Sequence, residues 1–145
     1  MTALTAPKVS TASSLKAGIA AGLIGGLVFG MMMAMMGMLP MVGMLVGTDS
    51  AIVGFIVHMG ISATIGAIYG LVAARLPQST VATAVAGIVN GIVWWVLGAL
   101  ILMPFLLGMT SMIFVIGQDQ WFSLMGHIIF GLVTAFAFVP LSKRL

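Results

Sequence analysis

Four long apolar runs, separated by short turns, constrain the fold of this chain more than any other feature. With a window of about 20 residues, they predict membrane-spanning helices over residues 15–39, 51–74, 81–103 and 120–139. Charged residues make up 5% of the chain, whereas a water-soluble domain carries about 25%. Such a chain cannot cover a globule with polar surface, so the sequence predicts an all-α fold, a four-helix transmembrane bundle.

The charges predict how the bundle is oriented. With four spans, all five basic residues fall on one side of the membrane and both acidic residues on the other: Lys8, Lys16, Arg75, Lys143 and Arg144 against Asp49 and Asp119. The positive-inside rule makes the basic side cytoplasmic. We therefore expect a cytoplasmic tail over residues 1–16, a membrane domain over 17–142 and a basic cytoplasmic tail over 143–145.

The two halves of the membrane domain, about 17–76 and 80–142, look like repeats. Gly22 and Gly26 correspond to Gly87 and Gly91, and a Pro followed by Gly recurs after each first span. Each half holds two spans, so both halves start on the same side. The sequence therefore predicts two repeated helical hairpins, related by an axis along the membrane normal.

A proline follows each odd-numbered span, at Pro40 and Pro104. Both positions lie where a crossing helix should be leaving the bilayer, and proline breaks or kinks a helix. About 12 residues after each proline are expected to form short interfacial or re-entrant segments on the outer side. Asp49 and Asp119, which follow these segments, are expected to cap the next helices.

His58 and His127, the two histidines of the chain, lie in the second and fourth spans. Each follows an aspartate by eight or nine residues, which places it about 12–14 Å below the outer surface. Two imidazoles at one level in a bundle could ligate a b-type haem. The alternatives are a bare metal or proton site, or hydrogen bonds that brace neighbouring helices.

Eight of the 14 methionines lie between Met31 and Met44. Thioethers bind Cu(I), and Met38, Met41 and Met44 recur every third residue, so one hypothesis is a copper site in an outer vestibule. The alternative is packing, because methionine is a flexible apolar filler.

Small residues predict how the helices meet. Gly18, Gly22, Gly26 and Gly30 recur every fourth residue, a spacing that lets two backbones approach closely. This stripe either joins helices within the bundle or binds another subunit or a second copy. Asn90, an amide well inside the third span, is expected to bond across helices.

Several classes of function are disfavoured. The chain has no cysteine, which excludes disulfides and thiolate chemistry. It has no carboxylate pair, phosphate loop or nucleophile–base set, so we expect no enzyme. Its cations are not clustered, so no nucleic-acid partner is expected. Two hypotheses remain: an accessory subunit of a larger membrane complex, such as an electron-transfer or respiratory complex, and a small transporter or copper-handling protein.

Short motifs in both halves resemble an uncharacterised family of small four-span bacterial membrane proteins. The matching residues are Leu39-Pro40 with Gly43, His58 with Gly66 and Tyr69-Gly70, Met103-Pro104 with Gly108, and His127 with Phe130-Gly131. The resemblance covers nearly all of the chain after residue 16. It implies a four-span fold in a bacterial cytoplasmic membrane, and it implies no activity.

Overall fold

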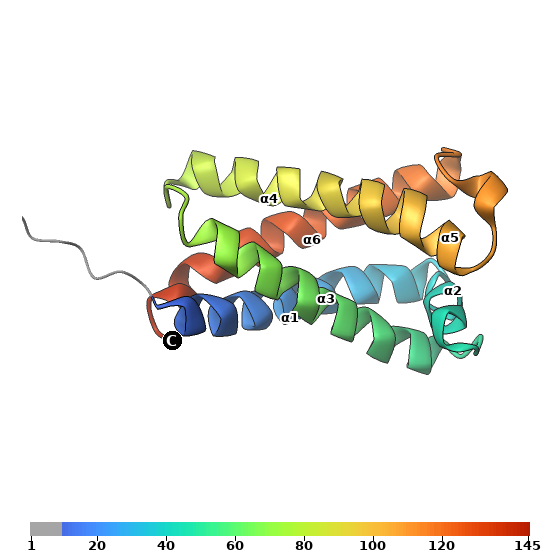
Figure 1. Ribbon diagram of the computed structural model, residues 1–145, viewed down its shortest axis with the longest axis horizontal. Helices are drawn as coiled ribbons and strands as arrows, with labels where there is room; N and C mark the ends of the chain where they lie inside the picture. The colour runs from blue at the N-terminus through green and yellow to red at the C-terminus, as the bar shows by residue number, and fades with distance from the viewer. Residues whose placement is uncertain (1–9) are drawn as a thin grey trace, which may run out of the picture.

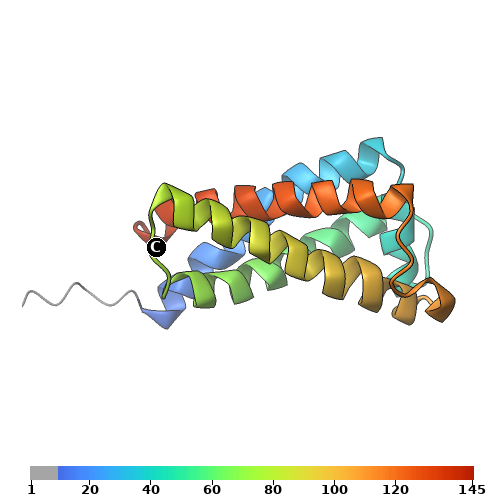
Figure 2. The ribbon, with the colours of Figure 1, turned by 90° about the horizontal axis from the view of Figure 1, so that it is seen from above.

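A computed structural model describes residues 10–145, and four long helices dominate it (Figures 1 and 2). The long helices are α1 (Thr11–Met35), α3 (Ala51–Ala73), α4 (Thr80–Trp94) and α6 (Gln118–Ser142). Helix α4 continues through the π-helical η2 (Trp95–Leu102) into α5 (Met103–Leu106). All four helices are long and apolar enough to cross a membrane. The predicted all-α, four-helix transmembrane bundle is confirmed, and the chain is a multi-pass membrane protein.

The charges lie at opposite ends of the bundle. One end holds the start of α1, the turn between α3 and α4, and the C-terminus (Figure 1). We call this end, which carries Lys16, Arg75, Lys143 and Arg144, the basic end. The opposite end carries Asp49 and Asp119 and is called the aspartate end. Lys8 and the rest of residues 1–9 lie outside the described residues. Residues 11–16, expected in a tail, already belong to α1, whose first turn is capped by the Ser10 side chain.

Helix α1 is the centre of the packing. It lies along α3 on one side and along α6 on the other, whereas α4 packs on α6. Helices α3 and α4 diverge from their shared turn (Figure 1) and make no extended contact within residues 10–145. A two-fold axis between the halves would require α4 to pack on α3 as α1 packs on α6. The packing therefore departs from the expected two-fold arrangement, and the sequence repeat stays a prediction.

The glycine stripe of α1 faces α3. A Cβ atom at Gly22 would lie 2.7 Å from Gly66 Cα, and one at Gly18 would lie 2.9 Å from Gly70 Cα. At these positions the two backbones touch directly, which any side chain would prevent. The stripe therefore joins helices within the bundle, and its glycines are not a free surface for another subunit.

Helices α4 and α6 meet through a shorter set of glycines. A Cβ atom at Gly87 would lie 2.7 Å from the Gly131 carbonyl oxygen, and one at Gly91 would meet the backbone of His127. Asn90 lies between these glycines, and its side-chain nitrogen is buried with no hydrogen-bond partner within residues 10–145. The bond across helices expected of Asn90 is therefore absent from the part of the chain that the structure describes.

The prolines act differently from the sequence expectation. Pro40 stands in the first turn of the short α2 (Leu39–Gly43), where its missing N–H costs no helical bond. Pro104 does not break its helix, which runs on to Leu106 after the wide π turns of η2. Pro140 lies inside α6, which continues to Ser142.

The two segments at the aspartate end differ. The first end segment (residues 36–50) contains α2 and η1 (Met44–Val46), and α2 packs on α3 through buried Leu39, Val42 and Gly43. The second end segment (residues 107–117) contains η3 (Thr110–Met112), and most of its side chains are exposed. The first end segment therefore packs on the bundle through buried residues, whereas the second end segment is mostly exposed.

The aspartates are not the caps. Ser50 caps α3 by accepting a bond from the Val53 N–H, and Gly117 stands at the cap position of α6. Asp119 lies in the first turn of α6, where its charge complements the helix dipole. The expectation that the aspartates cap α3 and α6 is therefore wrong, because Ser50 and Gly117 occupy the two cap positions.

Candidate functional site

His58 is buried in the interface between α3 and α1. Its Nε2–H donates a hydrogen bond of 2.9 Å to the carbonyl oxygen of Gly26 on α1. A carbonyl oxygen can only accept, so the ring hydrogen of His58 is on Nε2. The imidazole has space because α1 has glycine here: a Cβ atom at Gly30 would lie 3.1 Å from His58 Cδ2. His58 therefore links two helices at a position that the glycine stripe opens.

His127 on α6 bonds within its own helix. Its Nδ1–H donates a hydrogen bond of 2.8 Å to the carbonyl oxygen of Ser123, and the Ser123 hydroxyl lies 3.3 Å from the same nitrogen. The ring hydrogen is therefore on Nδ1, the opposite tautomer from His58. The two histidines occupy corresponding positions in the sequence, but His58 bonds to a neighbouring helix and His127 bonds to its own helix.

Phe29 of α1 brings the two imidazoles into one cluster. Its ring contacts His58 edge-on at a centroid distance of 5.5 Å, and it contacts His127 at 4.9 Å. Gly126 leaves the space for Phe29, because a Cβ atom there would collide with the phenyl ring. We call His58, Phe29 and His127 the histidine–phenylalanine cluster. The sequence analysis missed Phe29, although it stands among the glycines of α1 at Gly25, Gly26 and Gly30.

The cluster is well suited to bracing the bundle. One nitrogen of each imidazole is bound to a backbone carbonyl, and the edge-on contacts with Phe29 are favourable aromatic geometries. Within residues 10–145, no group of three or more His, Asp or Glu side chains is placed to hold a metal ion. A haem between the imidazoles would have to displace the Phe29 ring that contacts both of them.

The predicted methionine site is spread over the first end segment. Met38 is partly buried against the core, whereas Met41 and Met44 are exposed. An open hollow of about 440 Å³ lies nearby, lined by Met44, Gly47, Thr48 and Asp49. Of the three predicted copper ligands, Met44 lines the hollow. The structure therefore does not gather all three thioethers around it.

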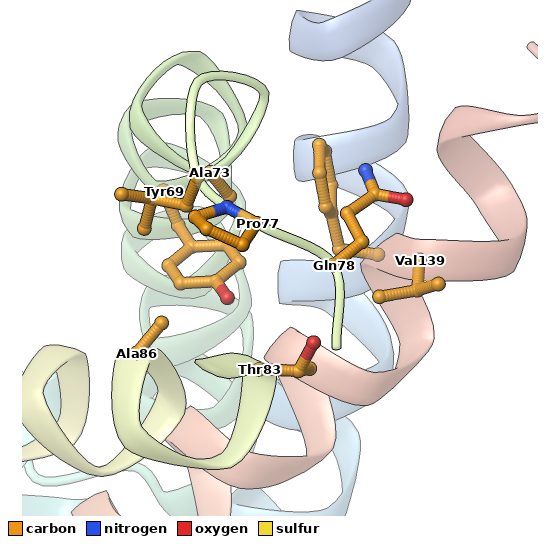
Figure 3. A pocket seen from close by; sticks show the side chains of 9 residues that line it. Tyr69, Ala73, Pro77, Gln78, Thr83, Ala86 and Val139 are labelled. Atoms are coloured by element: carbon orange, nitrogen blue, oxygen red, sulfur yellow. The ribbon is translucent and has the colours of Figure 1, made fainter. Parts of the chain in front are cut away.

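A second cavity lies at the basic end, between the ends of α3 and α4 and against α6 (Figure 3). Tyr69, Thr83 and Gln78 contribute polar groups to its wall. Its volume is about 10 Å³, which is room for about one water molecule. The cavity is too small to hold an organic ligand.

Comparison with protein-family models gave no match, and comparisons with curated proteins and with solved structures gave none either. The resemblance to the four-span bacterial family therefore stays a prediction, and the proposed function depends on the geometry of the chain itself.

Proposed function

We propose that this protein is a structural accessory subunit of a larger membrane complex, with His58 and His127 bracing its bundle. The observation that carries the proposal is the bonding of the histidine–phenylalanine cluster: both imidazoles bind backbone carbonyls and contact one phenyl ring. Such a cluster fixes the positions of α1, α3 and α6 relative to one another. No catalytic role is part of the proposal.

The surface of α4 is available to a partner in the membrane. Three residues of α4 are buried, Thr83, Gly87 and Gly91, and all three face α6. The other faces of α4 carry exposed Val85, Val89 and Val93 among other apolar side chains. Bilayer lipid can cover these faces, and a helix of a larger electron-transfer or respiratory complex would fit them equally well.

The orientation and the membrane are part of the same proposal. The basic end is the cytoplasmic end, because positive residues are retained on that side. The N- and C-termini then face the cytoplasm of a bacterium, and the protein lies in the cytoplasmic membrane.

A cofactor-holding version of the proposal places a b-type haem between His58 and His127. Ligation through Nε2 would require His58 to give up its bond to Gly26, and a haem between the rings would require Phe29 to leave its present contacts. His127 could keep its Nδ1 bond to Ser123, because a ligating histidine commonly donates its other ring N–H to a carbonyl. Bracing requires neither change, and the geometry therefore favours it. The copper-handling alternative depends on Met38, Met41 and Met44 and would need a rearrangement of the first end segment.

The experiment is to purify the protein from its native membrane and record its visible spectrum, its metal content and its size in mild detergent. We expect no Soret band, no stoichiometric copper and a particle larger than one chain with its detergent. A Soret band that His58→Ala or His127→Ala removes would establish the haem version. Bound copper that Met41→Leu and Met44→Leu release would establish the copper version, and a single chain in the native extract would contradict the accessory role.

A further inference from the structure

The second end segment (residues 107–117) presents an apolar surface at the aspartate end. Leu106, just before it, is 63% exposed, and Phe114 within it is 58% exposed. The other exposed apolar side chains of this segment are Met109, Met112, Val115 and Ile116. Between Arg75 and Asp119, residues 76–118 include no charged residue. This surface therefore favours an apolar environment over water.

The backbone of this segment is largely satisfied from within. The N–H of Met109 donates to the Pro104 carbonyl, that of Met112 to Met109, and that of Val115 to Met112. Similar bonds satisfy the N–H groups of Leu107, Gly108 and Ile113. A chain that enters the edge of a bilayer must bind its own amides, because little water is there to do so. The second end segment meets much of that requirement.

Pro104 and Phe114 hold the segment in place. Proline has no N–H, so it cannot bond to the Leu100 carbonyl in the helix. The Phe114 N–H donates to this carbonyl at 3.1 Å. Phe114 has a φ of +58°, a left-handed conformation that is unfavourable for a residue other than glycine. The chain thus turns sharply at an exposed phenylalanine.

The same surface is continuous with the exposed apolar surface of α4 and α5. Exposed Leu97, Leu102 and Phe105 lead from the helix to the segment. Beyond the segment, Trp121 is exposed and stacks on Trp95 with a centroid distance of 6.3 Å. Tryptophan prefers the boundary between lipid and water. The level of the segment is therefore the bilayer boundary.

We propose that the second end segment inserts into the lipid leaflet at the aspartate end, with Phe114 and Ile116 among the lipid. An apolar element at such a boundary lies about 5–10 Å deep. The first end segment differs because Leu39 and Val42 hold it against α3, although its Met41, Met44 and Val46 are exposed. The second end segment has no buried side chain, and it anchors the bundle in one leaflet.

The chain has no cysteine, so single cysteines can be spin-labelled without background. Phe114→Cys and Ile116→Cys test the segment, and they are made in the full chain and reconstituted in phosphatidylcholine vesicles. Asp49→Cys at the aspartate end is the water control, and Ile92→Cys on the exposed face of α4 is the lipid control. The measurement is the collision rate of each label with oxygen, which concentrates in lipid, and with a water-soluble nickel chelate.

We expect the ratio of oxygen to nickel collisions at positions 114 and 116 to exceed that at 49 several-fold and to stay below that at 92. Ile116→Cys keeps the measurement valid if replacing Phe114 alters the turn. Ratios at 114 and 116 equal to that at 49 would mean that the segment lies in water, which overturns the proposal. Labels shielded from both reagents would mean that protein covers the segment, which overturns it as well.

Discussion

The interface of α1 with α3 and that of α4 with α6 are built from the same residue type, and they hold their helices differently. In the first, glycines of both helices meet backbone to backbone over Gly18, Gly22, Gly66 and Gly70. Helix α1 is also fixed on its other side by α6, whereas α4 has one packed side. A close glycine contact therefore excludes a larger residue most strongly where neighbouring helices prevent the two helices from moving apart.

The largest difference is expected between Gly22→Ala and Gly87→Ala. A methyl group at position 22 meets backbone atoms of α3, and α1 cannot retreat because α6 lies behind it. We expect a loss of about 3 kcal/mol in the free energy of unfolding for Gly22→Ala, and about 1 kcal/mol for Gly87→Ala, because α4 can shift toward lipid. Unfolding in mixed detergent micelles with increasing SDS, followed by helical circular dichroism, measures both. Equal losses would show that α4 is held as firmly on α6 as α1 is held on α3.

Replacing His58 should lower the free energy of unfolding more than replacing His127. His58→Phe removes a bond between helices and leaves the Gly26 carbonyl without it, for an expected loss of about 1.5 kcal/mol. His127→Phe removes a bond within one helix, for an expected loss of about 0.5 kcal/mol. The same SDS titration checks the pair, and a larger loss for His127→Phe would contradict the assigned bonds.

Asn90→Leu should raise stability by about 1 kcal/mol, because the Asn90 amide nitrogen is buried without a partner within residues 10–145. Asn90 lies on α4, the helix with the less restrictive interface. The midpoint of SDS unfolding should move to a higher SDS fraction. A lower midpoint would show that the amide makes a bond that the structure does not contain.

The smallest effect is expected for Gly60→Ala on the exposed side of α3. A Cβ atom at Gly60 would meet no atom within 4 Å in residues 10–145. Alanine favours helix over glycine, so we expect a gain of about 0.5 kcal/mol. Gly66→Ala in the same helix is the matched control and should lower stability, because Gly66 touches the backbone of α1. A loss in both variants would mean that α3 has a partner on its outer side.

The sequence predicted the fold well because apolar length and charge placement are physical requirements of a membrane span. The four helices appear close to the expected ranges, and the charges segregate to the two ends. The path at Pro104 could not be predicted, because nothing in the local sequence indicates the wide π turns before it, where the Trp95 indole N–H donates to the Gln120 carbonyl. From the sequence alone, Pro104 indicates the end of a helix, whereas the helix continues past it.

The candidate site was predicted in part. The sequence selected His58 and His127, but it could not show that Phe29 contacts both rings or that their ring hydrogens lie on different nitrogens. Both facts depend on the rotation of α1, α3 and α6 about their axes. The alignment of the two halves suggested equivalent histidines, whereas the packing makes one a link between helices and the other a local contact.

The assigned bonds, from His58 on α3 to the Gly26 carbonyl on α1 and from His127 to the Ser123 carbonyl within α6, can be tested directly by ¹⁵N solid-state NMR of the histidine-labelled protein in bilayers. The chain has two histidines, so each ring can be assigned with one His→Phe variant. The account predicts a hydrogen on Nε2 for His58 and on Nδ1 for His127, each hydrogen-bonded. The same tautomer for both rings, or resonances shifted and broadened by a bound metal, would contradict it.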